Sequence, residues 1–291
     1  MQSTDEVATK LLDRDSYPPG VPCWVDTFQP DAGAAADFYG ALLGWEFEAR
    51  APDGEVEYLV ARLAGSAVAA VAPQPLDAPP QATWNTYVAV ASADDAAERV
   101  IAAGGSVLAG PFDVRDAGRM AVIADPGGAV LSLWQAGARK GAQLVNAPGS
   151  WNWSNLECSD AAGVQDFYWE VFGWEADAMA FGDADSAMLR LPGYGDFLAA
   201  RDPEVRRRHA QAGVPSGFSD AIGWIVPPAA DGAPPRWSVT FAVENPDAIA
   251  AHAAQLGGSV VVEPYDVAPV RIAVLRDPQG ARFTISAYRP E

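Results

Sequence analysis

The stretch 38-FYGALLGWEFEA-49 decides the fold, because it returns in the same chain as 167-FYWEVFGWEADA-178. The surrounding segments 24–49 and 153–178 align without a gap. Self-similarity over such a distance indicates duplicated structural units. The chain is therefore predicted to consist of two similar halves.

Each half is in turn predicted to contain two units of the same plan. In the first unit, an alternating segment ends at Gln29, and Asp31 can cap a helix over 32–43 that stops at Gly44. Three further alternating segments follow between turn residues. The order strand, helix, three strands recurs four times along the chain, which predicts an α+β fold with two cupped mixed sheets.

Composition shifts mark the boundaries of the two halves. Small and Gly-rich residues over 137–149 predict a linker. An insertion over 195–220 predicts a helical excursion that either covers a sheet edge or cavity mouth, or makes an interdomain or dimer contact. The predicted organisation is a disordered tail (1–16), a first domain (17–136), the linker and a second domain (150–291).

The bulk numbers exclude several classes of protein. At 291 residues with 49% hydrophobic side chains, each half can bury its own core. The formal net charge of -19 disfavours nucleic-acid and anionic membrane partners. Two cysteines make no disulfide framework, and neither a signal peptide nor a spanning apolar run is evident. A cytoplasmic monomer or homodimer with a small-molecule ligand is expected.

The repeated motifs resemble those of the vicinal oxygen chelate superfamily, which includes glyoxalases, extradiol dioxygenases and bleomycin-resistance proteins. The resemblance rests on Asp31 to Trp45, the Gly-Gly pair at Gly104, and the Asp-Pro turn at Asp125, each with a second copy. It covers nearly all of residues 20–289. Members of this family pair two units into an eight-stranded cup around one site, so the resemblance implies two cups.

The resemblance also implies metal-ligand positions near the start of each first strand and on each last strand. The residues at these positions are Trp24, Ala70, Asn85 and Ser132 in the first half, and Trp153, Trp224, Ser238 and Thr284 in the second. Indoles and methyl groups cannot ligate a divalent ion. We therefore expect no metal, no other cofactor, and neither glyoxalase nor ring-cleaving dioxygenase activity. Residual metal enzymology through an unusual ligand set is a weaker alternative.

Tryptophans gather at strand positions that alternate toward the predicted cups, with Trp151 beside them. Flat aromatic walls of this kind bind aromatic guests, although the same indoles could fill closed cores. The predicted ligand-binding residues are Trp24, Phe28, Trp84, Asn85, Tyr87, Trp134, Trp153, Asn155, Trp224, Trp237 and Thr240.

Asp26 and Glu157 are the predicted catalytic residues. A carboxyl group beside indoles in a poorly hydrated cup should have a raised pKa and could move protons near neutral pH. The structural alternative is a hydrogen bond to a neighbouring strand hydroxyl, such as that of Thr86 or Ser238. Two functions follow. The first is a metal-independent lyase, isomerase or cyclase that acts on a polycyclic aromatic or polyketide-like metabolite by cyclisation, ketal formation, dehydration or isomerisation. The second is a non-catalytic carrier or resistance protein that binds an aromatic natural product.

Overall fold

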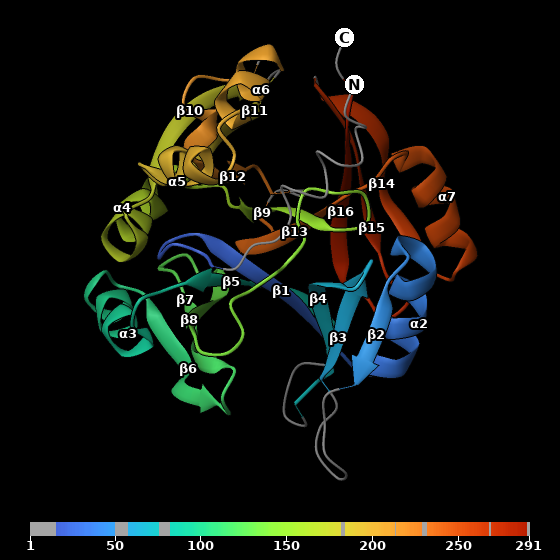
Figure 1. Ribbon diagram of the computed structural model, residues 1–291, viewed down its shortest axis with the longest axis horizontal. Helices are drawn as coiled ribbons and strands as arrows, with labels where there is room; N and C mark the ends of the chain where they lie inside the picture. The colour runs from blue at the N-terminus through green and yellow to red at the C-terminus, as the bar shows by residue number, and fades with distance from the viewer. Residues whose placement is uncertain are drawn as a thin grey trace.

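The computed structural model contains two eight-stranded mixed sheets with helices packed beside them (Figure 1). The disordered tail predicted over 1–16 lies outside the described part of the chain apart from residue 16. In that described part, no helix is long and apolar enough to cross a membrane. The structure describes residues 16–49, 58–75, 82–181, 184–212, 214–228, 232–267 and 269–289.

The first sheet has the strand order β2-β3-β4-β1-β5-β8-β7-β6. In its centre, β1 runs parallel to β4 and antiparallel to β5, and β5 runs parallel to β8. Two helices, α2 (Ala32–Leu43) and α3 (Ala93–Ala102), follow β1 and β5. The strands are β1 (Pro22–Gln29), β2 (Glu46–Ala49), β3 (Leu59–Leu63), β4 (Ser66–Pro73), β5 (Thr83–Ala89), β6 (Ser106–Val114), β7 (Gly118–Ala124) and β8 (Val130–Ala136).

The second sheet repeats this arrangement in the order β10-β11-β12-β9-β13-β16-β15-β14. Its strands are β9 (Trp151–Glu157), β10 (Glu175–Phe181), β11 (Ala184–Arg190), β12 (Ala221–Val226), β13 (Arg236–Ala242), β14 (Ser259–Val267), β15 (Val270–Arg276) and β16 (Arg282–Tyr288). Its helices are α4 (Ala161–Phe172), α7 (Pro246–Gln255) and, in the insertion, α5 (Tyr194–Arg201), α6 (Val205–Gln211) and the short η1 (Phe218–Asp220).

The repeated sequence motif is a capped helix in both halves. Asp31 Oδ1 accepts a hydrogen bond of 2.9 Å from the backbone nitrogen of Ala34, and α2 ends at Gly44 with a φ of 75°. Asp160 and Gly173 cap α4 in the same way. A left-handed terminal residue favours glycine because residues with a side chain rarely adopt this backbone conformation. The helix predicted over 32–43 is therefore confirmed to the residue.

The two halves share their core instead of folding around separate ones. Tyr39 in α2 donates a hydrogen bond of 2.9 Å to Asp277 in the turn before β16, and Trp84 Nε1 donates to the Tyr39 hydroxyl at 2.9 Å. Trp45 Nε1 donates to the Gly149 carbonyl at 2.6 Å. The helix of the first unit is thus bonded to the last unit of the chain, and α2 lies beside α7 in Figure 1.

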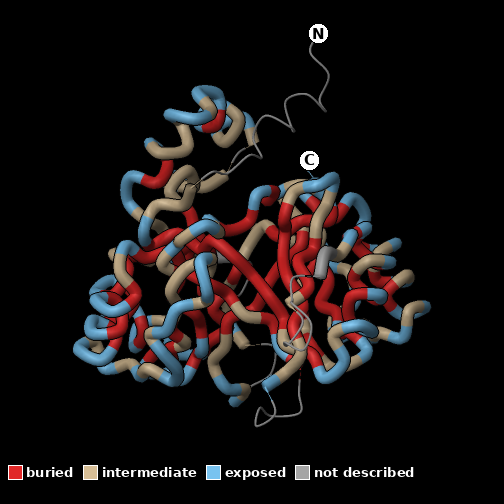
Figure 2. Tube along the Cα trace, turned by 60° about the horizontal axis from the view of Figure 1, so that its bottom comes forward, coloured by how far each residue is buried: buried red, intermediate tan, exposed pale blue. Residues whose placement is uncertain are grey.

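The equivalent contacts of the second half join its helix α4 to the second unit of the first half. Tyr168 donates to Asp125 at 2.8 Å, and Trp237 Nε1 donates to the Tyr168 hydroxyl at 3.0 Å. Trp174 Nε1 donates to the Gly20 carbonyl at 2.7 Å. The buried stretches of the chain therefore run through the strands in the middle of the molecule, while the outer helices keep exposed positions (Figure 2).

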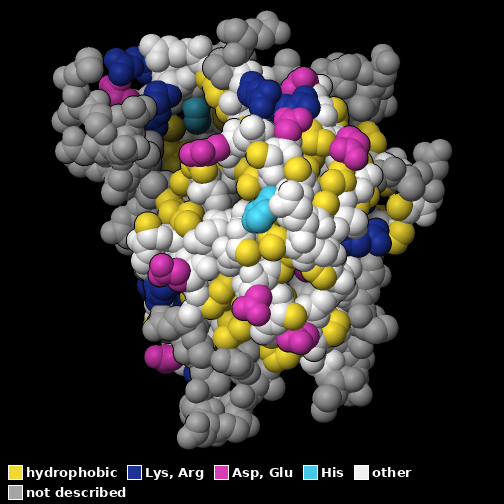
Figure 3. Space-filling model, turned by 90° about the vertical axis from the view of Figure 1, so that its right-hand side faces the viewer, with side chains coloured by type: hydrophobic (Ala, Val, Ile, Leu, Met, Phe, Trp, Pro, Cys, Tyr) yellow, Lys and Arg dark blue, Asp and Glu magenta, His cyan; other side chains and the backbone are white. Residues whose placement is uncertain are grey.

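Charged side chains are dispersed over the face that carries α7 (Figure 3). Among the described residues on this face, basic side chains are few, and most lie near acidic ones. Arg271, for example, forms an ion pair of 2.7 Å with Asp247 at the start of α7. The face offers no basic patch of the kind that binds phosphate backbones.

Replacing Tyr39 by Phe should lower the free energy of unfolding by about 1–3 kcal/mol, because the buried Asp277 carboxylate loses a donor that water cannot replace. Urea unfolding measures the change. The matched control is Tyr288→Phe, at a side chain that is 50% exposed, where a change within about 0.5 kcal/mol is expected. Equal effects of the two substitutions would contradict a structural role for the Tyr39–Asp277 bond.

Candidate functional site

A buried carboxyl group lies at the centre of the first cup. Asp26 Oδ1 accepts a hydrogen bond of 2.9 Å from Asn85 Nδ2. Its Oδ2 accepts from the hydroxyl of Tyr87 at 2.7 Å and from that of Tyr58 at 3.1 Å. The Tyr58 hydroxyl in turn accepts from Trp24 Nε1 at 2.9 Å. Two phenols, one amide and one indole thus form a connected network around a single carboxyl.

Strand register explains why these residues meet. Asp26 lies opposite Asn85 on one side and opposite Ala70 on the other. Ala70 lies opposite Val60 in β3, and Tyr58 precedes Val60 by two residues, so it shares the same face. The small side chain of Ala70 leaves room for the Tyr58 phenol to reach Asp26.

Burial changes the proton affinity of this cluster. It raises the pKa of Asp26 from 3.8 to about 6, although the bonds from Tyr87, Asn85 and Tyr58 favour the charged form. Burial and the neighbouring carboxylate also raise the pKa values of Tyr58 and Tyr87. The carboxyl therefore changes charge near neutral pH, while both phenols remain donors.

The cluster is closed on its floor and more open at its rim. Trp24, Asp26 and Tyr87 are buried, whereas Tyr58 and Asn85 are half-buried. Phe28 is half-buried on the same strand face, and the ring of Trp134 packs edge-on against Tyr87. A molecule at the rim would meet Phe28, Tyr58 and Asn85 before it reached the carboxyl.

The second cup lacks this carboxyl at the matching position. Asn155 stands where the first cup has Asp26, and Thr240 stands where it has Tyr87. Asn155 Nδ2 donates to Thr240 Oγ1 at 3.3 Å. The two cups therefore share a backbone plan but differ in chemistry.

Glu157, the second predicted catalytic residue, is held by arginines. Its two oxygens accept from Arg236 Nε and Nη2 at 3.0 and 3.1 Å, and Arg282 Nη1 lies 3.6 Å away. Arg236 is its partner in the strand register. Both oxygens thus bond to arginines and not to the Ser238 hydroxyl, and the catalytic role of Glu157 stays a prediction.

Trp84 and Trp237 also correct the sequence-based expectation, because they face the shared core and not a cup. Trp84 donates to the Tyr39 hydroxyl in α2, and Trp237 donates to the Tyr168 hydroxyl in α4. In the strand register Trp84 lies opposite Thr27, one residue from the face of Asp26, and Trp237 lies opposite Leu156. A shift of one residue moves a side chain to the other face of a sheet.

Aromatic side chains of the second cup extend into the insertion. The ring centroid of Trp153 lies 5.8 Å from that of Phe218 in η1 and 6.3 Å from that of Trp224. Both tryptophans are half-buried. The insertion thereby covers the mouth of a pocket beside Trp153.

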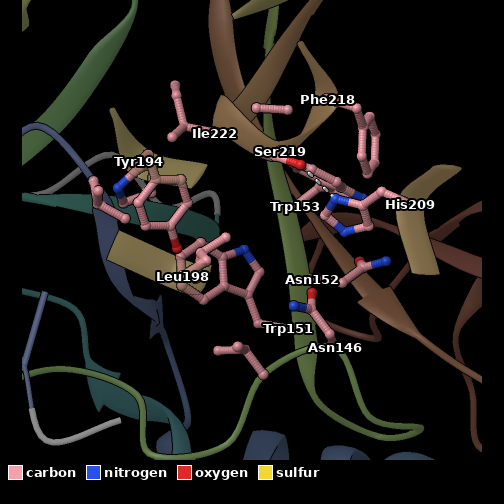
Figure 4. Close-up of a pocket in the computed structure, with 14 residues that line it drawn as sticks. Asn146, Trp151, Asn152, Trp153, Tyr194, Leu198, His209, Phe218, Ser219 and Ile222 are labelled. Atoms are coloured by element: carbon pink, nitrogen blue, oxygen red, sulfur yellow. Dashed lines mark hydrogen bonds between the residues drawn. The ribbon is translucent and has the colours of Figure 1, made fainter. Parts of the chain in front are cut away.

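This pocket has a volume of about 300 Å³ and is bounded by the insertion, β9 and the linker (Figure 4). Sequence reasoning missed most of it, because its walls come from segments far apart in the chain. The tryptophan-rich start of β9 and the position of the insertion were the available signals. The lining residues are Val21, Pro22, Val145, Asn146, Trp151, Asn152, Trp153, Tyr194, Leu198, His209, Phe218, Ser219, Ala221 and Ile222.

Comparisons with known proteins identify the family. The family model described as Glyoxalase/Bleomycin resistance protein/Dioxygenase superfamily matches residues 24–133, and the one described as Glyoxalase-like domain matches residues 153–286. The chain belongs to this superfamily. The resemblance inferred from the repeated motifs is thus confirmed, as is the fold of two tandem α+β units.

Two relatives of the superfamily are similar to this chain over nearly its full length. "Putative glyoxylase CFP32" of Mycobacterium tuberculosis is 38% identical over 282 residues, which cover 96% of this chain and 98% of the relative. "Anthracycline biosynthesis protein DnrV" of Streptomyces peucetius is 34% identical over 287 residues, which cover 94% of this chain and 95% of the relative.

Solved structures of superfamily members show the same fold. The Mn(II)-bound glyoxalase from Novosphingobium aromaticivorans aligns with a TM-score of 0.59 at 16% identity, covering 94% of this chain and 83% of that one. The 2,2',3-trihydroxybiphenyl 1,2-dioxygenase from Sphingomonas wittichii aligns with a TM-score of 0.58 at 15% identity, covering 93% and 91%.

The side chains around Asp26 in the first cup are a poor set of ligands for a divalent metal ion. Nowhere in the part of the chain that the structure describes do three His, Cys, Asp or Glu side chains come together. In the first cup, one carboxyl, Asp26, is surrounded by phenols, an amide and an indole. Divalent ions in proteins need several anionic or imidazole ligands.

Asp26→Asn should change how stability depends on pH. The folded-state pKa of Asp26 is raised, so its contribution to stability is present at low pH and is lost as pH rises through about 6. Between pH 5 and 7.5, the wild type should lose about 1 kcal/mol of unfolding free energy relative to the variant. Urea unfolding at several pH values measures this, with the exposed Asp166→Asn as control. Parallel profiles for wild type and Asp26→Asn would show that Asp26 does not titrate in this range.

Proposed function

We propose that this protein is a metal-independent enzyme that performs acid–base chemistry on a polycyclic aromatic or polyketide-like metabolite. Asp26 is the proton acceptor and donor of the proposal, and the first cup is its site. Cyclisation, ketal formation, dehydration and isomerisation are the reaction types that such chemistry serves. The proposal includes a cytoplasmic monomer or homodimer without nucleic-acid or membrane partners. The net charge of -19 supports the absence of nucleic-acid and membrane partners.

The observation that carries the proposal is the proton affinity of Asp26 in its network. A general base or acid works best when its pKa lies near the working pH. Burial brings the pKa of Asp26 to about 6, and three side-chain donors hold the carboxyl in one orientation. A carboxyl with only a structural role gains nothing from this value.

The network supplies a route for the proton. Trp24 Nε1 donates to the Tyr58 hydroxyl, so the hydroxyl proton of Tyr58 is directed to Asp26 Oδ2. When the half-buried Tyr58 accepts a proton from a substrate, it passes its own proton to the carboxylate. The substrate is left as an enolate or alkoxide, and the protonated Asp26 returns the proton at another position. Asn85 and Tyr87 keep the carboxyl in place through both transfers.

The aromatic nature of the substrate is supported by the walls and by one relative. The indole of Trp24 and the ring of Phe28 lie on the same strand face as Asp26. DnrV, 34% identical to this chain, is named as an anthracycline biosynthesis protein. Aromatic walls with few polar groups are typical of sites for flat, largely apolar ligands.

A carrier or resistance protein that sequesters an aromatic natural product is the second candidate. It is favoured by the closed floor of the first cup, where Asp26 is fully buried. Both oxygens of its carboxyl already accept hydrogen bonds from side chains of the protein. A carrier needs the aromatic walls but no titrating carboxyl, so substitution of Asp26 separates the two functions.

Deuterium exchange into aromatic ketones tests the enzyme. In D2O, proton NMR follows exchange at the carbon next to the carbonyl of α-tetralone and of tetracyclic anthracyclinones. Wild type should accelerate exchange of at least one compound, with a rate that rises with pH through about 6, because the carboxylate is the base. Asp26→Asn should lower the rate by about 100-fold or more.

Asp166→Asn, at an exposed position of α4, is the control and should retain the wild-type rate. If Asp26→Asn exchanges as fast as wild type, Asp26 is not the base. If wild type and Asp26→Asn bind these compounds equally well and neither accelerates exchange, the carrier function replaces the enzyme.

A further inference from the structure

The pocket between the insertion and β9 is separate from the Asp26 network. Its walls combine α5, α6 and η1 of the insertion with the start of β9, the linker and the first residues of β1 (Figure 4). None of the residues that bond Asp26 lines it. The pocket therefore exists only where both halves and the insertion come together.

A buried indole nitrogen in its wall is without a hydrogen-bond partner. Trp151 is 5% exposed, and its Nε1 makes no hydrogen bond. In Figure 4 the indole of Trp151 has its nitrogen toward the space enclosed by Tyr194, Ser219 and His209. A buried N–H without an acceptor costs free energy, so its persistence calls for an acceptor supplied from outside the chain.

The other buried tryptophans of the described residues make this unpaired N–H conspicuous. Each of them donates from its indole nitrogen to a side chain or a carbonyl of the chain. They are Trp24, Trp45, Trp84, Trp134, Trp174 and Trp237. The fold thus satisfies every buried indole except the one in the pocket wall.

The character of the walls defines the ligand. The rings of Trp153, Tyr194 and Phe218 provide flat apolar surface, and none of the lining residues that the structure describes is Asp, Glu, Lys or Arg. Burial, and then the charge of Arg208, lower the pKa of His209, which favours the neutral form of its ring. Its Nδ1 lies 3.0 Å from Ser219 Oγ. Asn152, another lining residue, has a buried Oδ1 without a partner.

We infer that this pocket binds a neutral, flat aromatic compound whose carbonyl oxygen accepts a hydrogen bond from Trp151 Nε1. The rings of the ligand pack against Trp153 and Phe218, and a hydroxyl on the ligand can donate to Asn152 Oδ1. The volume of about 300 Å³ is at the lower end of the range of small-molecule sites. This site is additional to the proposed Asp26 site and does not depend on it.

Fluorenone and fluorene test the inference, because they are flat tricyclic compounds that differ by the carbonyl oxygen. Equilibrium dialysis should show saturable fluorenone binding that is roughly tenfold tighter than that of fluorene. Trp151→Phe keeps an aromatic ring but removes the N–H. It should weaken fluorenone binding roughly tenfold and leave fluorene binding within about twofold.

Three further variants place the site. Leu198→Trp adds bulk to the pocket wall and should weaken binding of both compounds. Trp169→Phe, at a tryptophan that is 53% exposed, and Asp166→Asn, at an exposed position of α4, should change neither affinity. Unchanged fluorene binding by Trp151→Phe also shows that this variant is folded.

Two outcomes would overturn the inference. One is the absence of saturable fluorenone binding to the wild type, and the other is a preference for fluorenone over fluorene that survives in Trp151→Phe. Normal binding by Leu198→Trp would place the ligand outside this pocket. None of these results bears on deuterium exchange by Asp26, so failure of this site and failure of the proposed enzyme are distinguishable.

Discussion

The hydrogen bonds between Tyr39 and Asp277 and between Tyr168 and Asp125 are the contacts on which the rest of the structure depends. Asp277 shapes its own turn, where Oδ1 accepts from the backbone nitrogens of Gln279 and Ala281 at 3.0 and 2.8 Å. Its other oxygen accepts from Tyr39 in the opposite half. One buried carboxylate thus organises a hairpin and anchors a helix from elsewhere in the chain. A buried charge is tolerated only when its acceptors are satisfied in this way.

These contacts set the direction in which each sheet faces. With the helices of one half packed on the units of the other, the central strands of the two sheets meet, as the 2.7 Å contact between the hydroxyls of Thr86 and Ser154 shows. The face of β1 that carries Asp26 is left on the other side of the sheet. The shared core therefore takes up one face of each central strand and leaves the opposite face for a ligand site.

The duplicated halves have diverged where chemistry is concerned and have remained alike where the fold is concerned. The tyrosine, tryptophan and aspartate that join the halves occur in both copies. Asp26, in contrast, is replaced by Asn155, and Glu157 is paired with Arg236 and Arg282. The insertion adds a pocket to the second half alone. We interpret the first cup as the site of proton transfer and the second half as a binding element.

The sequence alone determined the repeat, the capped helices and the order of the strands along the chain, because caps and strand alternation depend on residues close together in the chain. Tertiary structure decided which face of a strand is buried against the other half. Trp84 was predicted to face the cup, but it lies one position away in the strand register and faces the core. Glu157 forms ion pairs with arginines of β13 and β16. The unpaired indole nitrogen of Trp151 could not be predicted from the sequence either, because the absence of a partner depends on every segment that packs around it.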